Sequence, residues 1–242
     1  MHLLSRRRID GAVEQHFTLN SIPGILWTPP ESADPTPLVL LGHPGGLDAL
    51  YPRLVQRALS TVALGASCAT LELPGAGDRP PLPGAADARA DLRAALSAGD
   101  PVPDDVVDRL VLPLVDQAVP EWQAALDALL DLPGITGPAA YSGGFLAIGV
   151  RLAVAEPRIR AAGLFAGSVI PRRTFDEARD VTVPIHMLLQ WDDEFNDRRA
   201  ALDLFDAFGS REKTLQANLG GHTGVPSYAG EDAARFFARH LR

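Results

Sequence analysis

The segment Pro138-Ala139-Ala140-Tyr141-Ser142-Gly143-Gly144-Phe145-Leu146-Ala147 places a serine between an apolar run and a helix-like run of small and aliphatic residues. This arrangement predicts a sharp turn from a buried strand into a helix, with Ser142 in a strained backbone conformation at the turn. Small residues two positions before and after the serine would let the strand and the helix approach closely. A helix N-terminus beneath the serine would favour negative charge. Ser142 is therefore a candidate nucleophile.

The runs on either side of this segment predict repeated strand–helix units. An alternating run at 13–19 and its successor at 22–28 predict a hairpin, and continuous apolar runs predict strands buried on both faces. The expected strands are 37–42, 67–73, 139–141, 160–167, 185–190 and 213–218, and the expected helices are 53–64, 145–155, 198–208 and 229–240. The pattern predicts an α/β fold with a mostly parallel central sheet of about eight strands and helices on both faces.

One stretch interrupts this alternation. Residues 74–138 are far more than a single crossover helix needs. The part at 79–104 is rich in Pro, Ala, Gly and Asp, and the part at 105–130 has helical apolar spacing, which predicts one or two short helices and then a core crossover helix over about 119–130. We expect a single domain over residues 1–242, in which the insertion at about 79–118 is either a small lid over a site or a solvated excursion.

Composition and charge narrow the function classes. The chain of 242 residues is 46% hydrophobic and has a net charge of −8, which argues against nucleic acid or anionic membranes as partners. Its single cysteine, Cys68, excludes an internal disulfide. No apolar run follows the basic residues near the N-terminus, and none elsewhere has the length of a membrane span. The expectation is a cytoplasmic protein, monomeric or homodimeric, without metal or cofactor.

A base and an acid follow two later strands. His222 lies in Gly220-Gly221-His222-Thr223-Gly224, after the strand expected at 213–218, where imidazole could act as a base near neutral pH or be polar surface. Asp193 lies in Trp191-Asp192-Asp193-Glu194-Phe195, where a carboxylate could orient the imidazole or cap the next helix. Because parallel sheets carry their sites at the carboxyl ends of strands, the two residues and Ser142 could meet.

The chain order Ser142, Asp193, His222 resembles that of the α/β-hydrolase superfamily. The resemblance covers nearly the whole chain and is greatest to small bacterial serine esterases related to dienelactone hydrolases. The elbow resembles the family motif Gly-x-Ser-x-Gly, with Ala140 at the first glycine. Dienelactone hydrolases have cysteine at the elbow, so Ser142 favours general ester hydrolysis. The resemblance also favours Asp193 over Asp192 as the acid and implies His222 as the base.

Further residues are expected around this site. The resemblance implies an oxyanion hole formed by the N–H groups of Gly143 and Gly45, because Pro44 has no N–H to donate; the glycine loop could also be a turn without a catalytic part. Pocket candidates, each of which could instead serve local packing or a turn, are His43, Pro44, Tyr141, Trp191 and Asp78.

These features predict a serine hydrolase that cleaves a small-molecule carboxylic ester through an acyl-enzyme. Thioesterase, lactonase, C–C bond hydrolase and biosynthetic acyl-transfer reactions use the same residues and stay open as alternatives. A non-catalytic ligand-binding member of the fold is the alternative from another class.

Overall fold

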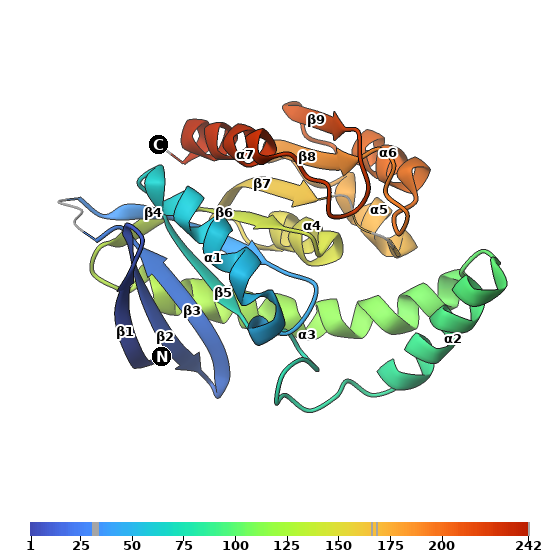
Figure 1. The fold of residues 1–242 in the computed structure, drawn as a ribbon, viewed down its shortest axis with the longest axis horizontal. Helices are drawn as coiled ribbons and strands as arrows, with labels where there is room; N and C mark the ends of the chain where they lie inside the picture. The colour runs from blue at the N-terminus through green and yellow to red at the C-terminus, as the bar shows by residue number, and fades with distance from the viewer. Residues whose placement is uncertain (31–33, 166, 168, 242) are drawn as a thin grey trace.

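A mixed sheet of nine strands forms the centre of the computed structural model, which describes the chain except residues 31–33, 166, 168 and 242 (Figure 1). The strands are β1 (His2–Ile9), β2 (Ala12–Leu19), β3 (Ile22–Thr28), β4 (Thr36–Gly42), β5 (Ser67–Leu71), β6 (Ile135–Gly143), β7 (Ile159–Phe165), β8 (Ile185–Gln190) and β9 (Lys213–Asn218).

The strand order across the sheet is β1-β2-β3-β5-β4-β6-β7-β8-β9. The pairs β1–β2, β2–β3 and β3–β5 are antiparallel. The remaining neighbouring pairs, from β5–β4 across the sheet to β8–β9, are parallel. The predicted hairpin is confirmed as β2 and β3, in which Leu19 pairs with Ile22. Strand β1 was not predicted, because almost all of its residues are exposed and its sequence lacks an apolar pattern.

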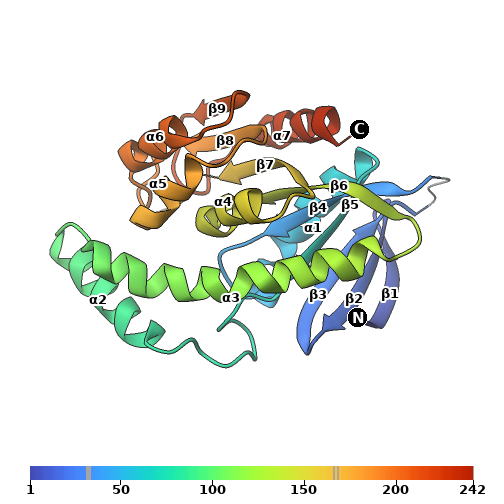
Figure 2. The same cartoon turned by 180° about the vertical axis from the view of Figure 1, so that it is seen from behind.

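Alternate residues of the central strands serve two separate cores, so the sheet is covered on both faces as predicted. Val39 and Leu41 of β4 pack with α1 and α7, whereas Leu38 and Leu40 pack with α3 and α4 on the opposite face. Figures 1 and 2 show the two helical layers from opposite sides. The helices are α1 (Leu47–Ala63), α2 (Ala85–Ala98), α3 (Asp104–Leu130), α4 (Leu146–Ala155), α5 (Arg172–Ala178), α6 (Arg198–Ala207) and α7 (Ser227–His240).

The insertion differs from its prediction in one respect. A core helix confined to about 119–130 is wrong, because α3 is a single helix of 27 residues that contains Pro113 and Pro120. Buried valines at 107, 111, 115 and 119 recur every four residues past Pro113, and Trp122 and Leu126 continue this apolar stripe beyond Pro120, where it packs in the core. The packing outweighs the local cost of each proline. Helix α2 packs against α3 near its N-terminal half (Figure 2).

Among the residues that the structure describes, no helix combines the length and the apolar character needed to span a membrane.

Candidate active site

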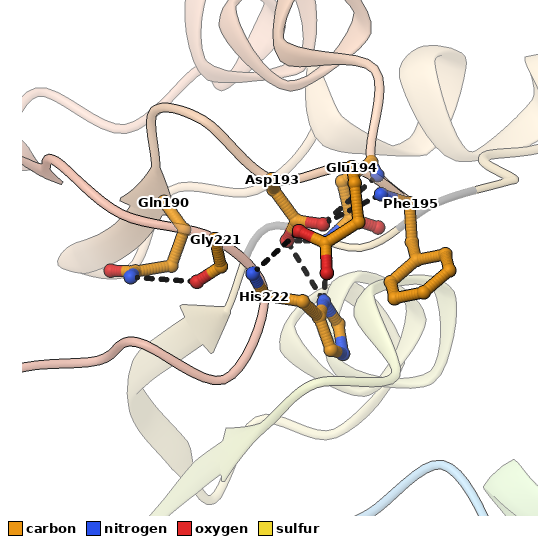
Figure 3. Close-up of polar contacts among 7 residues, drawn as sticks. Gln190, Asp193, Glu194, Phe195, Gly221 and His222 are labelled. Carbon is orange, nitrogen blue, oxygen red and sulfur yellow. Dashed lines mark hydrogen bonds and ion pairs between the residues drawn. The ribbon is translucent and has the colours of Figure 1, made fainter.

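Asp193 and His222 form a hydrogen-bonded pair at the carboxyl ends of two neighbouring strands. Asp193 follows β8 and His222 follows β9, and the Trp191 N–H joins the two loops by donating to the Asn218 carbonyl at 2.7 Å. The His222 Nδ1 lies 2.9 Å from Oδ2 of Asp193 (Figure 3). A carboxylate in this position fixes the imidazole orientation and leaves Nε2 for chemistry.

The Asp193 carboxylate is held ionised by the loop that contains it. Its side chain is only 5% exposed, and burial alone would raise its pKa. The Phe195 N–H donates to Oδ1 at 2.9 Å, and hydrogen bonds from Asn196 and His222 act in the same direction, so the pKa of Asp193 lies below its ordinary value. The negative charge can therefore stabilise an imidazolium at His222.

Several contacts around the pair involve residues that the sequence did not single out. Glu194 Oε2 accepts the backbone N–H of His222 at 3.1 Å, and Gln190 donates to the Gly221 carbonyl at 3.2 Å (Figure 3). The amide of Asn196 contacts both the Asp193 carboxylate and the His222 ring. The spacing Asp193-x-x-Asn196 is the available sequence signal, because an aspartate often accepts the N–H groups two and three residues later.

A cavity of about 830 Å³ opens beside the pair. Its wall includes the loop Gly42-His43-Pro44, the turn Gly144-Phe145, and Asp193 and His222 themselves. The insertion supplies another part of the wall, from the loop before α2, from α2 and from the N-terminal half of α3, through Leu82, Ala85, Arg89, Leu92, Leu110, Val111 and Leu114. The volume lies within the usual range of small-molecule sites.

Ser142 lies in a different environment from the one predicted. The strained turn is wrong for this residue: Ser142 belongs to β6, pairs with Leu41 and Gly163, and has no positive φ. The turn begins after Gly143, and Gly144 lines the cavity of the acid–base pair whereas Ser142 does not. No hydrogen bond joins the serine to His222 among the described residues. Its Oγ instead accepts a hydrogen bond of 3.2 Å from Arg57 on α1.

The two predicted oxyanion donors also lie outside the cavity wall. Gly143 is the last residue of β6, and a Cβ there would lie 2.8 Å from the Gly42 Cα, so the close approach of β4 requires glycine. Gly45 follows Pro44 but does not line the cavity. A Cβ built on Gly144 would meet only Phe165, at 4.0 Å, so this position has room for a side chain.

The pocket candidates separate into two groups. His43 and Pro44 line the cavity as expected, and burial lowers the pKa of His43, whose Nε2 lies 2.8 Å from the Leu71 carbonyl. The other three do not line it. Tyr141 is fully buried on the face of α3, Trp191 is exposed beside Arg198, and Asp78 is exposed. Tyr141 points away because strand side chains alternate between faces.

Comparison with known proteins gives structural matches along the whole chain. No sequence-family model matches it, and no curated protein sequence matches it. A cold-adapted esterase from an Arctic intertidal metagenomic library is 26% identical, with 100% of both chains covered and a TM-score of 0.77. The chain has the α/β-hydrolase fold. Acetyl xylan esterase 1 from Thermoanaerobacterium is 13% identical, with 100% of this chain and 88% of the other covered and a TM-score of 0.65.

A Klebsiella pneumoniae protein assigned as a dienelactone hydrolase is 14% identical, over 95% of this chain and 98% of the other, with a TM-score of 0.67. These matches confirm the resemblance to esterases and dienelactone hydrolases. In such an α/β-hydrolase fold the described cavity has the expected location, beyond the carboxyl ends of the parallel strands.

Proposed function

We propose that this protein hydrolyses a small-molecule carboxylic ester in the cavity beside His222. The observation that carries the proposal is the Asp193–His222 pair, with its 2.9 Å hydrogen bond, at the wall of the 830 Å³ cavity. An imidazole oriented by an ionised carboxylate is the general base that ester hydrolysis needs near neutral pH. The full-length likeness to an esterase supports the same reaction class.

In this proposal Ser142 is the nucleophile. His222 takes the Ser142 proton as Oγ attacks the ester carbonyl, and Asp193 stabilises the imidazolium. The N–H groups of Gly143 and Gly45, which lie outside the cavity wall in the observed conformation, bind the oxyanion once the site has rearranged. His222 then protonates the leaving alcohol and activates the water that releases the acid.

The attack requires a rearrangement, because Ser142 is hydrogen-bonded to Arg57 in the observed conformation. The serine must leave Arg57 while the turn after β6 changes so that Oγ reaches the cavity. Gly143 and Gly144 have no Cβ and give this turn conformational freedom. Substrate binding would supply the free energy for the change.

The insertion is proposed as a lid over this site. Residues of α2 and of the N-terminal half of α3 line the same cavity as His222, which a solvated excursion would not do. The lid would therefore contribute to the choice between an ester, a thioester and a lactone, which share the first chemical step.

The position of Ser142 favours a second candidate function, a ligand-binding protein without catalysis. The residue at the turn that faces the cavity is Gly144, which carries no nucleophile. In that case the cavity would bind a small molecule and release it unchanged.

Turnover of p-nitrophenyl acetate and butyrate tests the proposal on wild type, Ser142→Ala and His222→Ala. We expect measurable wild-type turnover, reduced about 10⁴-fold or more by Ser142→Ala and about 10²- to 10⁴-fold by His222→Ala. Ser97→Ala, at an exposed position on α2, is the matched control and should turn over like wild type. An inert wild type would support the binding function. Undiminished turnover in Ser142→Ala would exclude the serine mechanism.

A further inference from the structure

A second cavity of about 410 Å³ lies on the face of the sheet covered by α1 and α7. Most of its wall is apolar, from side chains that include Val39, Leu41, Leu64, Phe237 and Leu241. It does not contain Asp193 or His222. Arg57 and Phe165 line both cavities, and the guanidinium of Arg57 lies 5.4 Å from the centre of the Phe165 ring, so this pair stands at the boundary between them.

Arg57 is the cation of this second cavity. Its Nη1 donates to the Gly42 carbonyl at 2.8 Å, and its Nη2 donates to the carbonyl and the Oγ of Ser142. The described residues offer no hydrogen-bond acceptor to its Nε–H. Burial lowers its pKa, and no carboxylate of the described chain acts on it. Among the described residues, the positive charge is thus balanced by carbonyl dipoles, a hydroxyl and the Phe165 ring, and by no carboxylate.

Other arginines with little exposure contrast with Arg57. The side chains of Arg79 and Arg151 are 12% and 13% exposed, and they pair with Glu121 and Glu177 respectively. A desolvated charge ordinarily has such a partner, because an isolated buried ion is costly. Arg57 retains its charge without one, although the chain has an excess of acidic residues. An anionic ligand would supply the missing partner.

We propose that this second cavity binds an aliphatic monocarboxylate, with the carboxylate on Arg57 and the tail between α1 and α7. A guanidinium binds a carboxylate through strong charge-assisted hydrogen bonds. The Ser142 hydroxyl accepts from Arg57 and has no acceptor for its own hydrogen among the described residues, so it can donate to the same carboxylate. The single cation matches a single negative charge, and the apolar wall matches an alkyl chain.

This site does not depend on ester hydrolysis, and its test uses binding alone. We would measure decanoate binding by isothermal titration calorimetry on wild type, Arg57→Met and Arg53→Met, with decanol as the uncharged probe. Arg53 is the matched control, because it is exposed on the same helix and lines only the first cavity. We expect saturable binding of decanoate that Arg57→Met weakens about tenfold or more and Arg53→Met leaves unchanged, with decanol clearly weaker.

A second variant keeps the test decisive if Arg57→Met does not fold. Ala234 on α7 also lines the second cavity, so Ala234→Phe should occupy the space of the tail and weaken decanoate binding by a similar factor. The proposal is overturned if wild type does not bind decanoate, if decanol binds equally well, or if Ala234→Phe and Arg57→Met both bind like wild type. Loss of binding in Arg53→Met alone would place the acid in the first cavity and also overturn it.

Discussion

The loops after β8 and β9 and the end of β6 were predicted to meet, yet they differ in what they contact. Asp193 and His222 bind each other beside the larger cavity, whereas Ser142 binds Arg57 on the α1 face of the sheet. The order of residues along the chain predicts which strand a candidate residue follows. It does not predict on which face of the sheet the side chain lies, because that depends on the exact residue at which the strand ends. Because side chains alternate along a strand, a difference of one residue reverses the face.

The largest expected effect is on the acid–base pair, where removing the charge of Asp193 should lower the rate of ester hydrolysis. In Asp193→Asn the carboxamide cannot stabilise an imidazolium, and its N–H can hold the wrong tautomer of His222. We expect kcat for p-nitrophenyl butyrate to fall about 10²- to 10⁴-fold.

Asp192→Asn is the control for this change, since Asp192 accepts the Gly220 N–H and, among the described residues, forms no hydrogen bond with His222. It should retain most of the activity. Equal losses in the two variants would show that the loop, rather than the Asp193 charge, carries the effect.

On the serine side of the comparison, removing the hydrogen bonds of Arg57 should lower the free energy of unfolding. Arg57→Met leaves the carbonyls of Gly42 and Ser142 without their side-chain donor in a partly buried place. The expected loss is about 1–3 kcal/mol, which corresponds to a decrease in Tm of several degrees for a chain of this size. Thermal unfolding followed by circular dichroism measures it. A Tm equal to or above that of wild type would mean that the desolvation of the guanidinium outweighs its hydrogen bonds.

A substitution in the insertion should cause a smaller effect, a change in the KM for the substrate. Leu92 on α2 lines the larger cavity, so Leu92→Ala should raise KM for p-nitrophenyl butyrate about two- to fivefold with kcat nearly unchanged. Leu96→Ala is the matched control, since Leu96 lies one turn further along the same helix, is 63% exposed and lines neither cavity. If both variants behave like wild type, α2 does not contact the substrate.

The smallest effect is the pH dependence of the Asp193 contribution to folding. The pKa of Asp193 is lowered in the folded state, so its ionised form stabilises the fold above the ordinary value near 3.9. The contribution is lost as pH falls below that value through the folded pKa. The difference in unfolding free energy between wild type and Asp193→Asn, from urea titrations, should therefore stay constant above about pH 5 and shrink as the pH falls below about 4. A difference that stays constant over the whole range would contradict the lowered pKa.

The spacing of apolar residues predicted most of the fold, because buried strands and helices need apolar side chains at regular positions in the sequence. The runs that became β4, β8 and β9 are recognisable from their apolar or alternating residues, and α6 and α7 were found within a few residues. Strand β1 has no such apolar pattern. Helix α3 was predicted as separate helices, with the core helix only over about 119–130, because tertiary packing rather than local preference maintains the single long helix.

The site was partly predictable for a related reason. Polar residues directly after two expected strands indicated this part of the site, and the resemblance then favoured Asp193 over Asp192 and implied His222 as the base. This signal does not depend on the pairing register of the strands. Asn196 was missed although the spacing Asp193-x-x-Asn196 offers a local signal for it. Arg57 was missed because its role depends on a contact between α1 and β6, which are distant in the sequence. The face of Ser142 depends on where β6 ends, and Gly143-Gly144 contains no feature that marks this point.

The most direct test of the account is to find the residue that a fluorophosphonate probe modifies. The wild-type protein and His222→Ala would be incubated with the probe, digested, and mapped by mass spectrometry, with p-nitrophenyl butyrate turnover measured on the same samples. The account predicts a phosphonate on Ser142 in wild type and slow or absent labelling in His222→Ala, since the serine must reach the base to react. Ester turnover without any label on Ser142 would contradict it.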